Sequence, residues 1–389
     1  MRRNPALSYL RAFITVLVLA HHAVLAYHPF APMPPRSLMA QPRMWGAFPV
    51  VDVQRWSPFS LLVSFNDTFF MALMFFLSGL FVWQSLQRKG SGSFLRDRVL
   101  RLGVPFLVAV ILLAPLAYYP SYLQTGATAG IAGFWQQWHS LGAWPVGPAW
   151  FLWLLLAFDA VAALSMALVP RWFEGLQSKV FKASPRPFVF FSGLVLASAV
   201  AYIPMEFAFG AIQWTGFGPF FFQTSRMLHY GVYFLAGIAV GSHGVQRGLL
   251  AAGGTIARQW IRWSVASLVS FVATVALFIA TLSIHTAPRL WESFGDLAFV
   301  VCCAATCCAF LALFTRFAAK QSAVFDSLSA NAYGMYLIHY AIVSWLQYEL
   351  LGAHLSAWTK GLIVFLGTVA LSWTITSIVR RIPSVARVV

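Results

Sequence analysis

Acidic residues are scarce in this chain, which has 10 Asp and Glu against 26 Lys and Arg in 389 residues. Charged residues of both signs make up only 9% of the sequence, where a soluble domain averages about 25%. Hydrophobic residues reach 60%, and the mean hydropathy is +0.75. This composition excludes an ordinary soluble protein and indicates a multi-pass protein of the lipid bilayer.

Cysteine is also rare, and its four copies lie together in one apolar stretch with the sequence CCAATCC. These residues are Cys302, Cys303, Cys307 and Cys308. No His or carboxylate follows them closely in the sequence, so the spacing of a metal site is missing. We expect them to be small buried hydrophobes, with no disulfide framework, no bound metal and no permanently bound cofactor.

Hydrophobic runs predict an all-α bundle of about ten transmembrane helices in a single domain, residues 1–389. Each run reaches or nearly reaches the roughly 20 residues that cross a bilayer. The predicted spans are 6–28, 59–85, 103–123, 148–170, 187–206, 225–242, 263–284, 294–315, 331–351 and 360–380. No internal repeat is evident by eye, which disfavours the repeat-built transporter folds.

The basic residues are distributed unevenly over the predicted loops. With a cytoplasmic N-terminus, 19 of the 26 Lys and Arg fall in cytoplasmic segments, five in outer segments, and Arg11 and Arg226 within spans. By the positive-inside rule both termini are cytoplasmic. The positive charge is therefore explained by topology, and no nucleic-acid partner is expected. The basic start and long apolar run of the N-terminus predict an uncleaved anchor.

An arginine and a histidine lie eleven residues apart in the first hydrophobic run, YLRAFITVLVLAHHAVLAYH. At about 100° per residue they return to nearly the same helix face, roughly 16 Å apart along the axis. A cation in hydrocarbon costs about 3 kcal/mol or more, so such residues normally face a bundle interior and carry function. Arg11 and His22 are therefore the first candidates for a functional site.

Both residues also have a structural interpretation. Arg11 either neutralises a carboxylate, with Asp67 or Asp159 as the obvious partner, or anchors an anion or carbonyl group. His22 titrates near neutral pH and can move a proton, or it is a core histidine with a hydrogen-bonded neighbour. His22 is predicted toward the outer side of its helix, where it would meet an outer acceptor.

The first inner loop carries the pattern RxxR at Arg98 and Arg101. Residues three apart are neighbours on a helix, and guanidinium groups suit phosphate oxygens. Positive-inside topology supplies the same residues, however, so the pattern taken alone is weak.

Several other polar or aromatic side chains fall within the predicted spans or near their outer ends. Asp67 lies at the predicted depth of His22, in the outer part of the second span. Outer tryptophans, among them Trp150, either mark the membrane interface or offer flat faces for sugar rings. The secondary candidates are His339, Trp150, Asp159 and Arg226.

Taken together, these motifs resemble those of the membrane acyltransferases of family three. That family has an arginine, ten residues and a histidine in its first helix, matched here by Arg11 and His22. The RxxR of its first inner loop is matched by Arg98 and Arg101. The segments FFLSGLF, WFLWLLL and YGMYLIHYAIV are also similar to the family's, and the chain looks closest to the periplasmic-glucan branch, glucan biosynthesis protein C.

The resemblance implies a specific activity. Members take an acetyl or succinyl group from cytoplasmic acyl-CoA and transfer it to a hydroxyl of an extracytoplasmic carbohydrate across the bacterial inner membrane. The first-helix histidine is the family's catalytic residue, and its arginines are linked to donor binding. The corresponding hypothesis is that His22 deprotonates the acceptor, with Asp67 orienting its imidazole. A covalent acyl-histidine relay is the alternative, and the sequence does not separate the two.

Two other classes of function use similar residues. A secondary transporter or a flippase for a sugar-linked substrate would also place Arg, Asp and His within the membrane. Such a protein has no evident need for a CoA-phosphate clamp at RxxR. A membrane haem protein would need histidines paired at matched depth. His22, His229 and His339 lie on three different spans and form no evident pair of this kind. The identity of the acyl group, the acceptor and the oligomeric state stay open.

Overall fold

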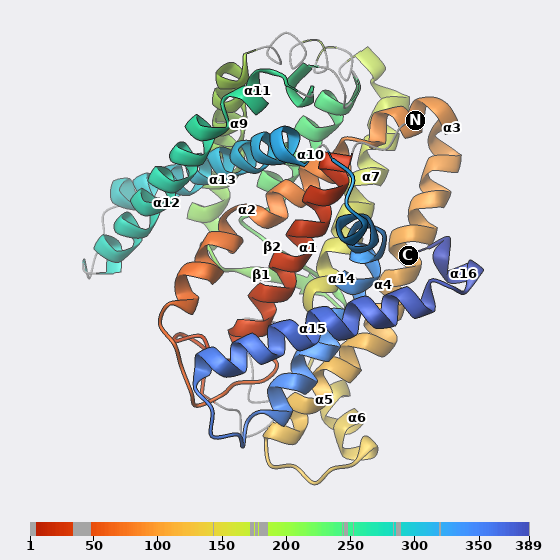
Figure 1. Ribbon diagram of the computed structural model, residues 1–389, viewed down its shortest axis with the longest axis vertical. Helices are drawn as coiled ribbons and strands as arrows, with labels where there is room; N and C mark the ends of the chain where they lie inside the picture. Colours follow the sequence, from red (N-terminus) through yellow and green to blue (C-terminus); the bar gives the residue numbers. More distant parts are fainter. Residues whose placement is uncertain are drawn as a thin grey trace.

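The computed structural model describes residues 5–33, 48–142, 144–171, 175, 178, 186–242, 244, 248–251, 253–282, 284, 289–318 and 320–388. Almost all of its regular structure is helical (Figure 1). The α-helices are α1 Pro5–Leu25, α2 Phe59–Gly79, α3 Val82–Arg98, α4 Val104–Val108, α5 Ala114–Gln124, α6 Ile131–His139, α7 Trp150–Leu168, α9 Pro187–Phe209, α10 Met227–Ser242, α11 Thr255–Arg258, α12 Trp260–Leu282, α13 Arg289–Phe317, α14 Ala323–Glu349, α15 Ala357–Val379 and α16 Pro383–Ala386. Single turns of other types are the π-helices η2 Val99–Gly103 and η3 Ala109–Leu113 and the 3₁₀-helices η4 Gly147–Ala149 and η5 Gly248–Leu250.

Eight helical segments in the described part of the chain are long and apolar enough to cross a membrane. The predicted all-α membrane bundle is thus confirmed. The sixth and ninth predicted spans are also helices, α10 and α14, but neither is among the eight. Helix α10 has only 16 residues. Helix α14 has 27, and its buried polar side chains lower its hydropathy; they include Asn331, His339, Ser344 and Gln347.

Three connecting segments contain regular structure that the predicted spans leave out. The Gly/Ser stretch of the first inner loop, residues 90–93, is helical as part of α3, which changes direction at Gly90, where φ is +75°. The outer segment before α7 contains the short helix α6. A two-stranded antiparallel hairpin precedes α10, with β1 at Trp214–Phe217 and β2 at Phe220–Gln223. None of these short elements has a hydrophobic run long enough to stand out in the sequence.

The chain from α3 to α5 is one long, repeatedly kinked helical segment (Figure 1). Its prolines explain part of this irregularity, because proline has no backbone N–H to donate. Pro120 leaves the carbonyl of Leu116, four residues earlier, without its helical donor. The indole N–H of Trp345 on α14 donates to that carbonyl at 3.1 Å. A side chain of α14 thus replaces the hydrogen bond that α5 lacks, which fixes α5 against α14.

Helices α2 and α10 pack with their backbones in contact. A Cβ added to Gly237 would lie 2.1 Å from the carbonyl oxygen of Phe76. A Cβ on Gly241 would lie 1.9 Å from the oxygen of Leu80. Small residues permit such close approach, a frequent device in membrane helix packing. This contact holds α2, and with it Asp67, against α10, which begins directly after Arg226.

Helices α12 and α13 form a pair that projects from the rest of the bundle, toward the left of Figure 1. Only 6% of the apolar window of α12 is buried in the protein, against 61% in α13 and in α1. Apolar side chains that the protein does not cover are covered by lipid in a membrane bundle. Helix α1 lies near the centre, where His22 is half-buried, whereas the side chain of Arg11 is exposed.

Candidate functional site

Helices α1 and α14 run parallel and are tied together at two levels. Near their starts, the hydroxyl of Tyr9 donates to Oδ1 of Asp326 at 2.7 Å. Thirteen residues later on each helix, Nε2 of His339 lies 3.3 Å from Nδ1 of His22. Thirteen residues rise about 20 Å on any α-helix, so equal spacing keeps the two contacts in register. The sequence contains both histidines, but it does not indicate that they meet.

A third contact fixes the helices beyond the histidines. The buried side-chain amide of Gln347 donates to the carbonyl oxygens of His22 at 2.9 Å and Ala23 at 3.2 Å. Those carbonyls lie in the last turn of α1, where no helical N–H follows to pair them. The side chain of α14 thus caps α1 directly at the catalytic candidate and limits its fraying.

The hydrogen-bond partners define the tautomers of both imidazoles. Nδ1 of His22 lies 2.8 Å from the carbonyl oxygen of Val18, and Nδ1 of His339 lies 2.6 Å from that of Tyr336. A carbonyl only accepts, so both Nδ1 atoms carry protons in the neutral state. Nε2 of His339 then accepts from the same Nδ1–H of His22. The consequence is that Nε2 of His22 holds a lone pair, ready to take a proton or attack an electrophile.

The neighbours of His22 are aromatic rings. Tyr340 presents its ring edge-on at a centroid distance of 5.2 Å. His21 meets the ring of His22 edge-on at 5.3 Å and stacks on Phe70 at 5.2 Å, which are packing contacts. Tyr340 in turn is packed against Gly147, whose φ is +53° and whose Cβ would lie 2.6 Å from the tyrosine ring. Only glycine fits there, so η4 and α14 approach closely beside the histidine.

Asp67 lies close enough to His21 for an electrostatic interaction, but its bonding partner is Arg226 and not His22. Its Oδ2 forms an ion pair with Nη1 of Arg226 at 2.8 Å, and the same guanidinium donates to the Asp67 carbonyl at 3.1 Å. Arg226 also lies over the ring of Phe299 at 4.8 Å. The hydrogen bond that orients His22 comes from Val18. The prediction that Asp67 orients His22 rested on their similar depth, but in the structure the Asp67 carboxylate pairs with Arg226.

The ion pairs also change the interpretation of the arginines. Asp159 is fully buried on α7, and its Oδ2 lies 3.2 Å from Nε of Arg98. Neither carboxylate proposed as a partner of Arg11 is therefore paired with it. Arg11 is exposed, lies 5.6 Å from the ring centre of Phe81, and is close enough to Arg98 for electrostatic repulsion. Arginines without a carboxylate partner are available to a negatively charged ligand.

Arg101 lies in the π-helical turn η2 and is exposed. A π-helix bonds i to i+5, so it has more residues per turn than an α-helix, and three residues cover less of a turn. Arg98 and Arg101 are thus farther apart around the axis than α-helical spacing predicts. Pro105 cannot donate to the Arg101 carbonyl, and the hydroxyl of Tyr333 does so instead. The turn that holds Arg101 is therefore fixed to α14.

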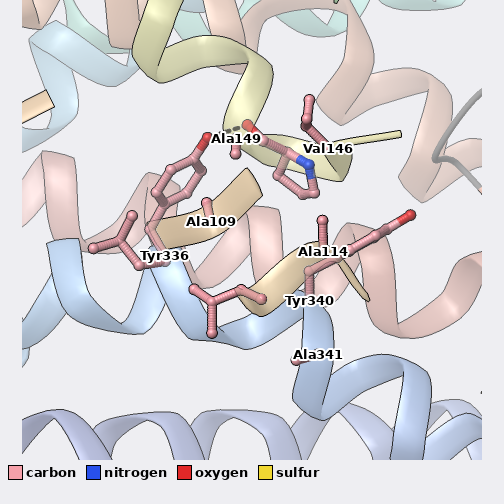
Figure 2. Close-up of a pocket in the computed structure, with 10 residues that line it drawn as sticks. Ala109, Ala114, Val146, Ala149, Tyr336, Tyr340 and Ala341 are labelled. Carbon is pink, nitrogen blue, oxygen red and sulfur yellow. Dashed lines mark hydrogen bonds between the residues drawn. The ribbon is translucent and has the colours of Figure 1, made fainter. Parts of the chain in front are cut away.

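A small pocket lies between α14, η3 and η4 (Figure 2), and two of its lining tyrosines contact the histidine pair. Tyr336 and Tyr340 of α14 line it, and the hydroxyl of Tyr336 donates to the carbonyl of Pro148 in η4. The Tyr336 ring also lies 5.8 Å from that of His339. Tyr333, Tyr336 and Tyr340 recur three and four residues apart, on one face of α14. That face leads from the Arg101 turn, past the pocket, to His22.

Trp150, at the start of α7, is part of an aromatic cluster. Its ring lies 5.6 Å from Trp214 in β1 and 5.9 Å from Tyr230 in α10, measured between centroids. These contacts occupy its faces and edges, and the side chain is half-buried. The position supports a packing role that joins the hairpin to the bundle.

The cysteines are all buried in α13. Sγ of Cys303 lies 3.5 Å from Nε2 of His229 in α10, a contact between distant segments that the sequence did not indicate. Among the residues that the structure describes, no group of three or more His, Cys, Asp or Glu side chains is arranged to hold a metal ion.

These features define a class: a multi-pass membrane protein with exposed arginines at one end, and a half-buried histidine that offers a lone pair and contacts a tyrosine of a small pocket. A family model described as an acyltransferase domain, that of acyltransferase family 3, matches residues 4–377. The chain therefore belongs to this family of membrane acyltransferases. The match is to the family as a whole and does not distinguish its glucan branch. No curated protein and no solved structure matches the chain.

Proposed function

We propose that the protein is an O-acyltransferase of the bacterial inner membrane. It takes an acetyl or succinyl group from acyl-CoA on the cytoplasmic side and transfers it to a hydroxyl of an extracytoplasmic carbohydrate. The observation that carries the proposal is the Nε2 lone pair of His22, whose ring is fixed by hydrogen bonds at Nδ1 and contacts Tyr340 of the pocket lining. A glucan is the acceptor that the sequence resemblance favours.

In the proposed reaction, His22 acts as the general base. The acceptor oxygen attacks the thioester carbonyl carbon while Nε2 of His22 takes the hydroxyl proton. The tetrahedral intermediate then breaks its C–S bond, and the imidazolium returns the proton to the leaving CoA sulfur. The products are the O-acyl ester and CoA thiol, with His22 back in its starting state. His339 accepts from Nδ1–H of His22 throughout and acts as a positioning residue.

The acyl-histidine relay uses the same lone pair. Nε2 of His22 would attack the thioester first, release CoA, and pass the acyl group to the acceptor oxygen in a second step. Both mechanisms need an unprotonated Nε2 and a fixed ring. Trapping an acylated peptide that contains His22 after incubation with donor alone distinguishes the relay from the direct transfer.

Arginines at the opposite end of α1 supply the donor's binding groups in this proposal. Arg101 and Arg11 are exposed and have no carboxylate partner among the described ion pairs. Arg98 contributes positive charge while its Nε pairs with Asp159. The phosphates of CoA bind guanidinium groups, and the pantetheine arm then follows the tyrosine face of α14 toward His22.

The test is isothermal binding of acetyl-CoA, succinyl-CoA and free CoA to the purified protein. We expect micromolar binding that weakens about tenfold or more in Arg101→Ala, since a charge-assisted contact is worth about 1.5–3 kcal/mol. Arg316→Ala, which removes an exposed arginine from the end of α13, is the matched control and keeps full affinity. Absence of binding by a folded protein would refute the acyl-CoA reaction and favour a transporter or flippase.

A further inference from the structure

The pocket whose Tyr340 contacts His22 is lined mainly by apolar side chains, several of them small (Figure 2). Four of its lining residues are alanines: Ala109, Ala114, Ala149 and Ala341. They come from η3, α5, η4 and α14, so the pocket is built by four separate elements rather than by one loop. The close approach of Gly147 to Tyr340 holds η4 in place at its edge.

The pocket is also very small. Its cavity volume is about 20 Å³. A cavity needs roughly 10–15 Å³ on the same measure to hold one water molecule. The space therefore suits a single methyl-sized group. A propionyl or butyryl chain would require the walls to move, and close-packed walls resist such movement.

No charged side chain lines the pocket. The polar side chains in the lining are those of Tyr336 and Tyr340, and the Tyr336 hydroxyl already donates a hydrogen bond to the carbonyl of Pro148. The second carboxylate of a succinyl group would lose its water here without gaining a cation. Burying an unpaired carboxylate is strongly unfavourable.

We propose that this pocket receives the acyl group of the donor and selects acetyl over succinyl and over longer chains. The inference rests on the proposed acyl-CoA reaction and deepens it by naming the donor. Leu113 lines the pocket, whereas its neighbour Leu112 is 61% exposed on η3. The methyl group lies among the alanines, and the carbonyl carbon faces His22.

The experiment measures CoA release and binding affinity with acetyl-, propionyl-, butyryl- and succinyl-CoA, using the full-length protein in detergent with a simple glycoside as acceptor. We expect acetyl-CoA to be preferred and succinyl-CoA to be the poorest donor. Leu113→Ala enlarges the pocket and should raise the butyryl-to-acetyl ratio at least tenfold, since each methylene is worth about 10–200-fold in a fitted site. Leu112→Ala is the matched control and should keep the wild-type profile.

Two outcomes would overturn the assignment of the pocket while leaving the reaction standing. One is turnover of succinyl-CoA as fast as that of acetyl-CoA. The other is an acyl-chain profile of Leu113→Ala that matches that of Leu112→Ala, with thermal melting confirming that both variants fold. Absence of binding and turnover with every donor would instead refute the acyl-CoA reaction itself, and the role of the pocket with it.

Discussion

Two of the polar pairs within this helix bundle are built on opposite principles. Arg226 and Asp67 neutralise each other at 2.8 Å, and Phe299 covers the guanidinium. Nε2 of His339 lies 3.3 Å from Nδ1 of His22, and each Nδ1 also donates to a backbone carbonyl of its own helix. The first pair leaves no charge uncompensated. The second leaves one nitrogen lone pair beside a pocket, which is what an acid–base catalyst requires.

The same contrast separates the arginines. Arg98 and Arg226 each have a carboxylate partner, while Arg11 and Arg101 have none among the described ion pairs. An intramembrane charge is a functional candidate by default, but a compensated pair is explained by the fold alone. The partners of these residues, which only the fold reveals, therefore separate the candidates that the fold alone explains from those that stay open to a functional role.

The largest expected effect comes from the histidine side of the comparison. His22→Gln keeps a polar side chain of similar size but removes the basic Nε2. We expect turnover of acetyl-CoA to fall about 10²–10⁴-fold, the range of general acid–base catalysis. The apparent melting temperature in detergent should stay near that of the wild type, because Gln347 still joins α1 to α14 through backbone carbonyls.

His21→Gln is the matched control for that variant. His21 stacks on Phe70 and takes no part in the hydrogen bonds of the pair. Its loss should reduce turnover only a few-fold, within the roughly 0.5–1.5 kcal/mol of an aromatic contact. Equal losses in the two variants would show that the region serves packing rather than catalysis.

The next largest effect is a loss of stability, and it is expected at the ion pair of Arg98 and Asp159. Arg98→Ala leaves the carboxylate of Asp159 buried without its partner, with 1% of its side chain exposed. Removing one member of a buried ion pair costs about 3–5 kcal/mol. We expect a clear fall in melting temperature for Arg98→Ala and none for the exposed Arg101→Ala.

The double variant Arg98→Leu/Asp159→Leu sharpens that prediction. Both charges are then absent, and an apolar pair of similar size commonly restores the stability of a buried ion pair. Recovered melting together with weakened CoA binding would show that Arg98 serves the donor as well as the fold. Recovered melting with full CoA affinity would limit the phosphate site to Arg101 and Arg11.

Much of the fold could be predicted from the sequence because lipid imposes a simple length rule on helices. All ten predicted spans correspond to helices, although α10 is short and α14 is too polar to qualify by composition. The breaks and π-turns between α3 and α5 could not be predicted. They depend on which carbonyls that a proline leaves unpaired accept a hydrogen bond from another helix, as the Leu116 carbonyl does from the Trp345 indole.

The site was only half visible in the sequence. Spacing along one helix reveals that Arg11 and His22 share a face, because helical geometry is local. Contacts between helices are set by packing, so the sequence did not show that His339 meets His22 or that Asp67 turns to Arg226. The tyrosines of α14 were missed. Their spacing at residues 333, 336 and 340 on one face, just before and after His339, was the available signal.

A smaller effect is expected at His339, the positioning residue. His339→Leu removes the acceptor for Nδ1–H of His22, while the carbonyl of Val18 still holds that proton. We expect kcat to fall about 10–100-fold, as for partners that orient a reactive side chain, with little change in KM for acetyl-CoA. His339→Gln offers an amide oxygen in place of Nε2 and should recover part of the loss. A fall in KM and kcat together, without rescue, would contradict the positioning role.

The smallest effect on turnover is expected at Asp67, and it decides between two roles for this carboxylate. As the group that orients His22, Asp67 should be as sensitive as His339. As the counter-ion of Arg226, it should matter chiefly to stability. Asp67→Asn keeps the backbone carbonyl that already accepts from Arg226, and about half of the side chain is exposed in the ion pair. We therefore expect turnover within about threefold of wild type and a loss of about 1 kcal/mol or less, as for a solvent-screened pair. A hundredfold fall in kcat with unchanged melting would instead mean that Asp67 leaves Arg226 during the reaction to act on the histidines, and the separation between the two polar pairs would no longer hold.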